Sequence, residues 1–230
     1  MMSQPVLVHA RPGLDRYTKR TRMMRKIFLV STLLLGAPLT AIAGDGMSYT
    51  YVEGGWNQLQ MSSSALKDPK ADGGYVRGSF AIAEQVNVFG GWSRVTDTSR
   101  YAYSSVKTTL DQPHLGIGYH MPISDRLDFT ADLAWNRRSG KSEVHSDGAS
   151  YTSKTSVNTA VGNFGLRGKP SAKTEAWLKA GYIDGNNHFD GTWTGTIGGQ
   201  VSFNRTWGVV AEGQFYDDFA EYRVGVRASF

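Results

Sequence analysis

Beyond about residue 45 the chain repeatedly alternates apolar with polar positions, a pattern that predicts β-strands with two unlike faces. We predict ten strands from these stretches, and periodicity of the helical kind is nearly absent. They fall at 48–60, 71–82, 86–97, 107–121, 126–138, 151–167, 173–184, 193–203, 206–217 and 220–230. The clearest alternation sets Leu127, Phe129, Ala131, Leu133 and Trp135 against Asp128, Thr130, Asp132 and Ala134.

One face of these strands is apolar, and the other carries full charges of both signs. Periodicity alone does not say which face points inward, but opposite charges can pair across a narrow lumen. The charges that we expect inside are Glu53, Arg77, Arg94, Asp128, Asp132, Arg167, Lys179, Glu212, Arg223 and Arg227. Aromatic residues near the strand ends resemble the two interfacial girdles of a membrane barrel: Trp56, Trp92, Trp135, Trp193, Trp207, Tyr119 and Tyr182.

The connections between the predicted strands alternate in length. Short links fall at 83–85, 122–125, 168–172 and 204–205, and longer polar links at 61–70, 98–106, 139–150 and 185–192. Only the link near 218–219 breaks this alternation, which is typical of outer-membrane barrels. The predicted fold is therefore all-β, a transmembrane antiparallel up-and-down β-barrel of ten strands. Eight strands is the alternative, if two segments form hairpins above the membrane.

The first 43 residues have the features of a leader and are treated apart from the barrel, which we place at 44–230. Arg25 and Lys26 precede the apolar run 27–35, and a small-x-small pattern ends at Ala43, after which we expect signal-peptide cleavage. A buried core helix is the alternative for this run, which is too short to span a bilayer. Residues 1–22 suggest a misplaced start or an extended basic region.

Charge and cysteine content narrow the classes of function. The formal net charge is +5, but seven of the 25 basic residues and one of the 20 acidic residues lie in the leader, so the remainder is near neutral. The basic isoelectric point is thus no evidence for nucleic-acid binding, and we expect no nucleic-acid partner. The absence of cysteine excludes a disulfide framework and a catalytic thiol.

The last strand keeps its alternation to the final residue. Its apolar positions are Tyr222, Val224, Val226, Ala228 and Phe230. This ending resembles the C-terminal signature of bacterial outer-membrane barrels, in which a terminal Phe follows alternating apolar residues. The resemblance implies recognition of this strand by the outer-membrane assembly machinery.

Two further segments carry a resemblance to a family. "MSYTYVEGGW" and "GGYVRGSFAIAEQVNVFGGWSRV" are similar to the small outer-membrane barrels of xanthomonads and their relatives, a family once proposed as the activator of a rice immune receptor. The similarity covers mainly residues 48–95 and the general layout to Phe230. It implies an integral outer-membrane barrel, also shed on vesicles, with no settled biochemical activity and no catalytic residues to carry over.

We predict no catalytic residue, cofactor or metal ion. His114 and His120 lie six residues apart on one strand, about 20 Å, and so cannot share a site. His145 and His188 lie in two long loops and could together form a hydrolase site, which is the enzymatic alternative. "DGNNHFDG" has oxygen side chains at Asp184, Asn186 and Asp190 but lacks the spacing and the bidentate Glu of a calcium loop.

The expected function is a structural or surface-interaction role, such as adhesion, host contact or envelope integrity, with polar loops displayed outside. A small ion or solute channel is the first alternative, because the predicted lumen is charged. Barrels of about eight strands fill their interior with side chains, whereas open channels need about sixteen. The expected partners are outer-membrane lipid and lipopolysaccharide, the assembly machinery, and host or surface ligands.

Overall fold

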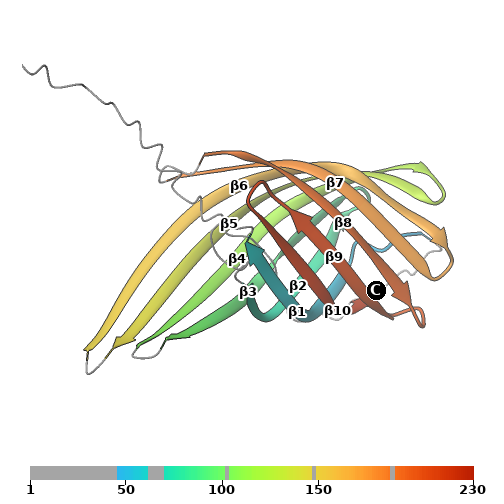
Figure 1. The fold of residues 1–230 in the computed structure, drawn as a ribbon. Coiled ribbons are helices and arrows are strands. Elements are labelled where there is room, and N and C mark those ends of the chain that lie inside the picture. Colours follow the sequence, from blue (N-terminus) through green and yellow to red (C-terminus); the bar gives the residue numbers. More distant parts are fainter. Residues whose placement is uncertain (1–45, 62–69, 102–103, 147–148, 187–189) are drawn as a thin grey trace, which may run out of the picture.

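The computed structural model describes residues 46–61, 70–101, 104–146, 149–186 and 190–230. Within these ranges the chain forms ten antiparallel strands, the number that the alternation predicts (Figure 1). Their bounds are β1 Tyr51–Met61, β2 Lys70–Ala83, β3 Val86–Tyr101, β4 Ser104–Ser124, β5 Leu127–Ser146, β6 Ala149–Ser171, β7 Thr174–Gly185, β8 Thr192–Ser202, β9 Trp207–Phe215 and β10 Phe219–Ser229. The leader, residues 1–43, lies outside the described ranges.

Each strand pairs with its neighbours in the chain, and β1 pairs with β10 to close the barrel. The closing register runs from Tyr51 opposite Ser229 to Met61 opposite Phe219. Closure leaves no free edge within the barrel, as a sheet in lipid requires. Within the described ranges, no helix is long and apolar enough to cross a membrane.

The two faces are arranged as the alternation predicts. On β5 the side chains of Leu133 and Trp135 point outward, with 59% and 49% of their surface exposed, whereas Asp128 and Asn136 are buried inside. Apolar side chains cover the outer surface around the barrel, among them Leu115, Ile117, Phe164, Leu166, Leu178, Ile197, Val201 and Val224. An apolar belt of this extent needs a lipid environment, because soluble monomers rarely expose large contiguous apolar patches.

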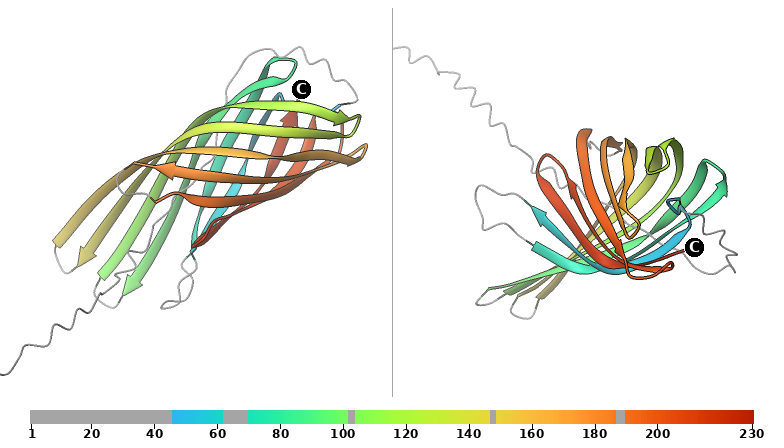
Figure 2. Two further views of the ribbon diagram at one scale, coloured as in Figure 1. Left: turned by 90° about the horizontal axis from the view of Figure 1, so that it is seen from above. Right: turned by 90° about the vertical axis from the view of Figure 1, so that its right-hand side faces the viewer.

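Strands β3 to β6 are longer than the 9–11 residues that suffice to cross a bilayer. They contain 16, 21, 20 and 23 residues. Our assignment of 98–106 and 139–150 to loops is therefore wrong: all but the tips of these segments continue the strands, because Ser99 pairs with Val106 and Val144 with Tyr151. We call the part of β3–β6 beyond the barrel, residues 94–101, 104–111, 137–146 and 149–158, the projecting sheet. Figure 2 shows these strands extending past the others.

The two ends of the barrel differ in the length of their connections. The short-turn end holds the tight connections at 84–85, 125–126 and 172–173, and the hairpin end holds the projecting sheet. Both Tyr51 and Ser229 lie at the short-turn end, where they pair with each other.

An apolar layer, which the alternation of single strands does not predict, lies inside the barrel toward the hairpin end. Its buried members are Leu59, Val95, Leu110, Ala134, Val161, Ile183, Tyr216 and Phe219. Tyr216 and Phe219 stack with ring centroids 4.3 Å apart at the tight connection between β9 and β10. The lumen thus contains a charged layer toward the short turns and an apolar layer above it.

Candidate functional sites in the lumen and on the projecting sheet

The centre of the lumen is a network of carboxylates and guanidinium groups. Glu53, only 1% exposed, lies opposite Arg77 on β2 and Arg227 on β10. Its carboxylate accepts hydrogen bonds from Arg77 Nε at 2.8 Å, Arg227 Nε at 2.8 Å and the Tyr75 hydroxyl at 2.6 Å. Glycine makes room for this tyrosine, because a Cβ on Gly225 would lie 2.5 Å from Tyr75 Oη.

A second carboxylate continues the network across the barrel. Glu212 Oε1 pairs with Arg77 Nη1 at 2.8 Å and with Arg223 Nη1 at 2.6 Å, and its Oε2 accepts from Trp177 Nε1 at 2.9 Å. Arg223 also pairs with the buried Glu221 at 2.7 Å. Glu53 and Glu212 therefore each meet partners from at least two other strands, which compensates part of the cost of their burial.

The remaining predicted inward charges also lie in the lumen and are paired. Lys179 Nζ lies 2.6 Å from Asp132 Oδ2, and Arg167 pairs with Glu175 on the neighbouring strand. Asp128 accepts a hydrogen bond of 2.7 Å from the hydroxyl of Tyr49, a residue that precedes β1. Tyr49 also stacks on His120, so side chains fill the lumen near the short-turn end.

Arg94 is the exception, and its placement in the lumen was wrong. The buried neighbours Ser93 and Val95 point inward, so Arg94 points outward, with 54% of its side chain exposed. It pairs with Asp111 at 2.7 Å, and its guanidinium lies 5.0 Å from the centre of the Trp92 ring. Arg94 belongs to the outer surface just beyond the girdle, where a charge can reach water.

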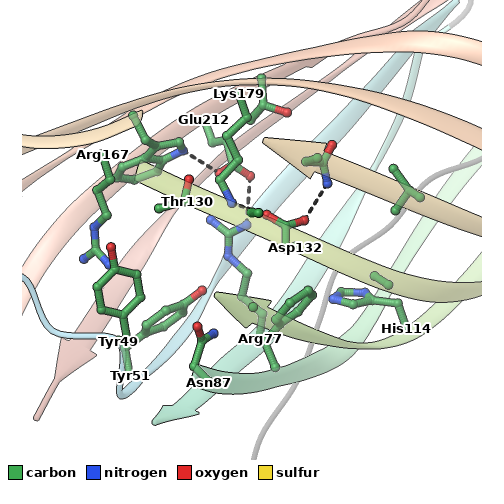
Figure 3. A pocket seen from close by; sticks show the side chains of 18 of the residues that line it. Tyr49, Tyr51, Arg77, Asn87, His114, Thr130, Asp132, Arg167, Lys179 and Glu212 are labelled. Atoms are coloured by element: carbon green, nitrogen blue, oxygen red, sulfur yellow. Dashed lines mark hydrogen bonds and ion pairs between the residues drawn. The ribbon is translucent and has the colours of Figure 1, made fainter. Parts of the chain in front are cut away.

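The lumen contains a cavity of about 170 Å³, and its lining includes seven charged side chains (Figure 3). Arg77, Asp132, Lys179 and Glu212 converge on it from four strands. A water molecule in the liquid occupies about 30 Å³, so the cavity is large enough for a few waters or a small ion. Its wall toward the hairpin end includes Ala134 and Val161 of the apolar layer.

The histidines do not form a common site in the described part of the chain. His114 and His120 are buried in the lumen, each 8% exposed, and His145 is exposed on the projecting sheet. His188 lies outside the described residues, so the hypothesis of a His145–His188 hydrolase site stays untested. Among the described residues no group of three His, Asp or Glu side chains could hold a metal ion.

The outer surface of the projecting sheet carries eight charged residues. We call it the basic face; its charged residues are Arg94, Arg100, Lys107, Arg137, Lys141 and Lys154 together with Asp111 and Glu143. Six bases thus face two acids. Lys141 donates a hydrogen bond of 2.6 Å to Glu143, which lowers the pKa of that carboxyl group.

The final strand, β10, places its alternating apolar side chains on the outer surface of the barrel. Tyr222, Val224 and Val226 are exposed on the outer surface, at 38%, 48% and 45%. The backbone N–H of Phe230 donates to Thr50 O at 2.9 Å, and Ser48 Oγ donates to Phe230 O at 2.6 Å. The last residue therefore belongs to the seam that closes the barrel.

Comparison with known proteins supports the fold alone. No family model and no curated protein matches the chain, so the resemblance to the xanthomonad family stays a prediction. The translocator domain of the autotransporter NalP from Neisseria meningitidis is similar over 79% of this chain and 88% of that domain, with 15% identity and a TM-score of 0.54. Ail, the attachment invasion locus protein of Yersinia pestis, shares 13% identity over 80% of this chain and 100% of its own, with a TM-score of 0.45. The chain therefore has the fold of a transmembrane, antiparallel up-and-down β-barrel.

Proposed function

We propose that this protein acts by contact at the cell surface, and that the projecting sheet is the part that makes the contact. The proposal requires that the short-turn end faces the periplasm and that the hairpin end faces the outside of the cell, which is the usual arrangement of outer-membrane barrels. The observation that carries the proposal is the length of β3–β6. Ser146 lies eleven residues beyond the girdle residue Trp135, which is roughly 35 Å along the strand.

The two surfaces of the projecting sheet differ, as expected of an interaction module. The outer surface is the basic face. The opposite surface carries an apolar row formed by Val106, Val144 and Tyr151, which are adjacent in register. Tyr151 is 70% exposed, and exposed tyrosine is enriched in protein–protein contacts. This supports adhesion or host contact as the specific role.

Shortening both hairpins is expected to abolish contact and leave the barrel intact. Thr96 pairs with Thr109 and Lys141 with Lys154 in one row across the sheet, so each pair can be joined by an Asn-Gly turn. We expect heat-modifiable migration in the outer-membrane fraction to be unchanged and adhesion of cells to surfaces or host cells to be lost. Full adhesion of the shortened protein in the same membrane amount would contradict the proposal.

A small channel remains the second candidate, because the lumen contains a cavity lined by charges. Conduction through it would require a path through the apolar layer and the ion-pair network. The buried side chains of the apolar layer offer a passing ion one polar group, the Tyr216 hydroxyl, and hydrophobic constrictions block flow by excluding water.

Removal of the stacked pair in the apolar layer is expected to produce conductance that the native barrel lacks. In planar bilayers we expect no stable current steps from the native protein and brief openings from the variant Tyr216→Ala/Phe219→Ala. The control is Phe215→Ala/Tyr222→Ala, which removes an aromatic pair from the outer surface of the same two strands. Stable conductance of the native protein would instead support the channel.

A further inference from the structure

The charge outside the barrel at the hairpin end is distributed unevenly. The basic face on β3–β6 has six bases and two acids. Outward strand positions near this end on the other sides include Gln58, Gln60, Lys70, Asp72 and Asp184. These include one base and two acids, and Gln58 donates a hydrogen bond to Asp72. The positive charge is therefore concentrated on one side of the barrel.

The basic face begins at the height of the aromatic girdle. Arg94 follows Trp92 and Arg137 follows Trp135 by two residues on the same outer surface, or about 7 Å along the strand. Tryptophan in membrane proteins sits at the headgroup level. These two guanidinium groups thus lie where the anionic headgroups of the outer leaflet are found, and guanidinium binds phosphate in bidentate fashion.

The basic face then continues away from the membrane. Lys141 and Lys154 pair across β5 and β6, and Lys107 and Arg100 lie farther toward the tips. A ligand that matches this face needs negative charge both at the headgroup level and above it. Lipopolysaccharide has this form, since phosphate groups are attached to its lipid part and to the sugars that extend outward from it.

We propose that the basic face binds the phosphate groups of a lipopolysaccharide molecule standing beside β3–β6 in the outer leaflet. This inference rests on the proposed outward orientation of the projecting sheet, but it does not require adhesion to another cell. A lipopolysaccharide bound there would support the outer surface of the projecting sheet and leave the Val106–Val144–Tyr151 surface free for a partner.

The test uses the purified barrel in zwitterionic detergent with a chelator, so that divalent cations do not bridge phosphates. Binding of rough lipopolysaccharide, and of the same material after removal of its phosphates, is measured by titration. We expect the native protein to bind the phosphorylated form about tenfold more tightly. Arg94→Gln/Arg137→Gln/Lys154→Gln should weaken that binding by about tenfold, at roughly 0.5 kcal/mol for each exposed charge pair.

The matched control is Arg126→Gln/Lys173→Gln/Arg205→Gln, three exposed bases at the short-turn end. It changes the net charge equally and should leave binding within about twofold. Equal loss in both triple variants, or equal binding of the two lipopolysaccharide forms, would overturn the inference. Binding of a soluble sulfated polysaccharide without binding of lipopolysaccharide would overturn it too, because the ligand would then come from outside the membrane.

Folding of each variant is checked by heat-modifiable migration. If the triple variant does not fold, Arg137→Gln alone provides the comparison, since Arg137 is exposed and pairs across the sheet with Asn158. The shortened protein lacks Arg100 and Lys107 but keeps Arg94, Arg137, Lys141 and Lys154. The binding assay needs no second cell, so loss of adhesion in that protein with a retained preference for phosphorylated lipopolysaccharide would separate this inference from the proposed function.

Discussion

Replacement of Glu53 by alanine is expected to lower the free energy of unfolding by about 3–5 kcal/mol. The carboxylate is buried and accepts hydrogen bonds from Arg77, Arg227 and Tyr75. Its removal leaves Arg227 without this partner in the lumen, and Arg77 with Glu212 as its remaining ion-pair partner. The measurement is denaturant unfolding in detergent, monitored on gels of unheated samples by the loss of the band that corresponds to the folded barrel.

The matched control is Asp111→Ala, which breaks the ion pair with Arg94. Because that pair is solvent-exposed, the expected loss is only about 0–1 kcal/mol. Glu53→Gln should fall between the two, since the amide oxygen can still accept a hydrogen bond but the charge is gone. Equal losses for Glu53→Ala and Asp111→Ala would show that the lumen network does not hold the strands together.

Leu178→Arg is expected to destabilise the barrel by about 2–4 kcal/mol in a bilayer. Leu178 is 62% exposed on the outer surface of β7, and it lies four residues from the girdle residue Tyr182, which places it near the middle of the membrane. An arginine there would have to leave water for hydrocarbon. The expected result is a lower unfolding midpoint in lipid vesicles and less protein assembled in the membrane.

Thr109→Arg provides the comparison for the same side-chain change outside the membrane. Thr109 lies in the projecting sheet, in register with Thr96 and Lys141. We expect a change within about 0.5 kcal/mol, as for most surface substitutions. If Leu178→Arg were as mild as Thr109→Arg, the outer surface would not meet lipid, and the sidedness of the barrel would have to be rejected.

The inward placement of most charges could be predicted because β-structure has a period of two. Once Asp128 and Asp132 are assigned to one face, the opposite face of β5 is determined with them. The same reasoning failed at Arg94, since the paired glycines Gly90 and Gly91 left the alternation of β3 unclear. Val95, 1% exposed, lies on the inward face of β3 and so places its neighbour Arg94 on the outward face.

The apolar layer could not be predicted from any one strand. Leu59, Leu110 and Ile183 are single apolar residues at inward positions of three strands, and each alone looks like an irregularity. Only closure of the barrel brings them to the same height. The projecting sheet was missed for a related reason: polar Ser, Thr and Lys residues are typical of loops, and their pairing as strands depends on neighbours far along the chain.

The sequence by itself determined the fold class and the outer surface and favoured ten strands over eight, because lipid imposes an apolar side chain at every second position of a spanning strand. Tertiary structure alone decided what fills the lumen and how far the sheet extends. Glu53 meets Arg227 across 174 positions of the chain, and the register of β1 on β10 makes that contact. Alternation specifies which face of the sheet a residue belongs to. Strand stagger and barrel closure decide which residues lie at the same height along the barrel axis.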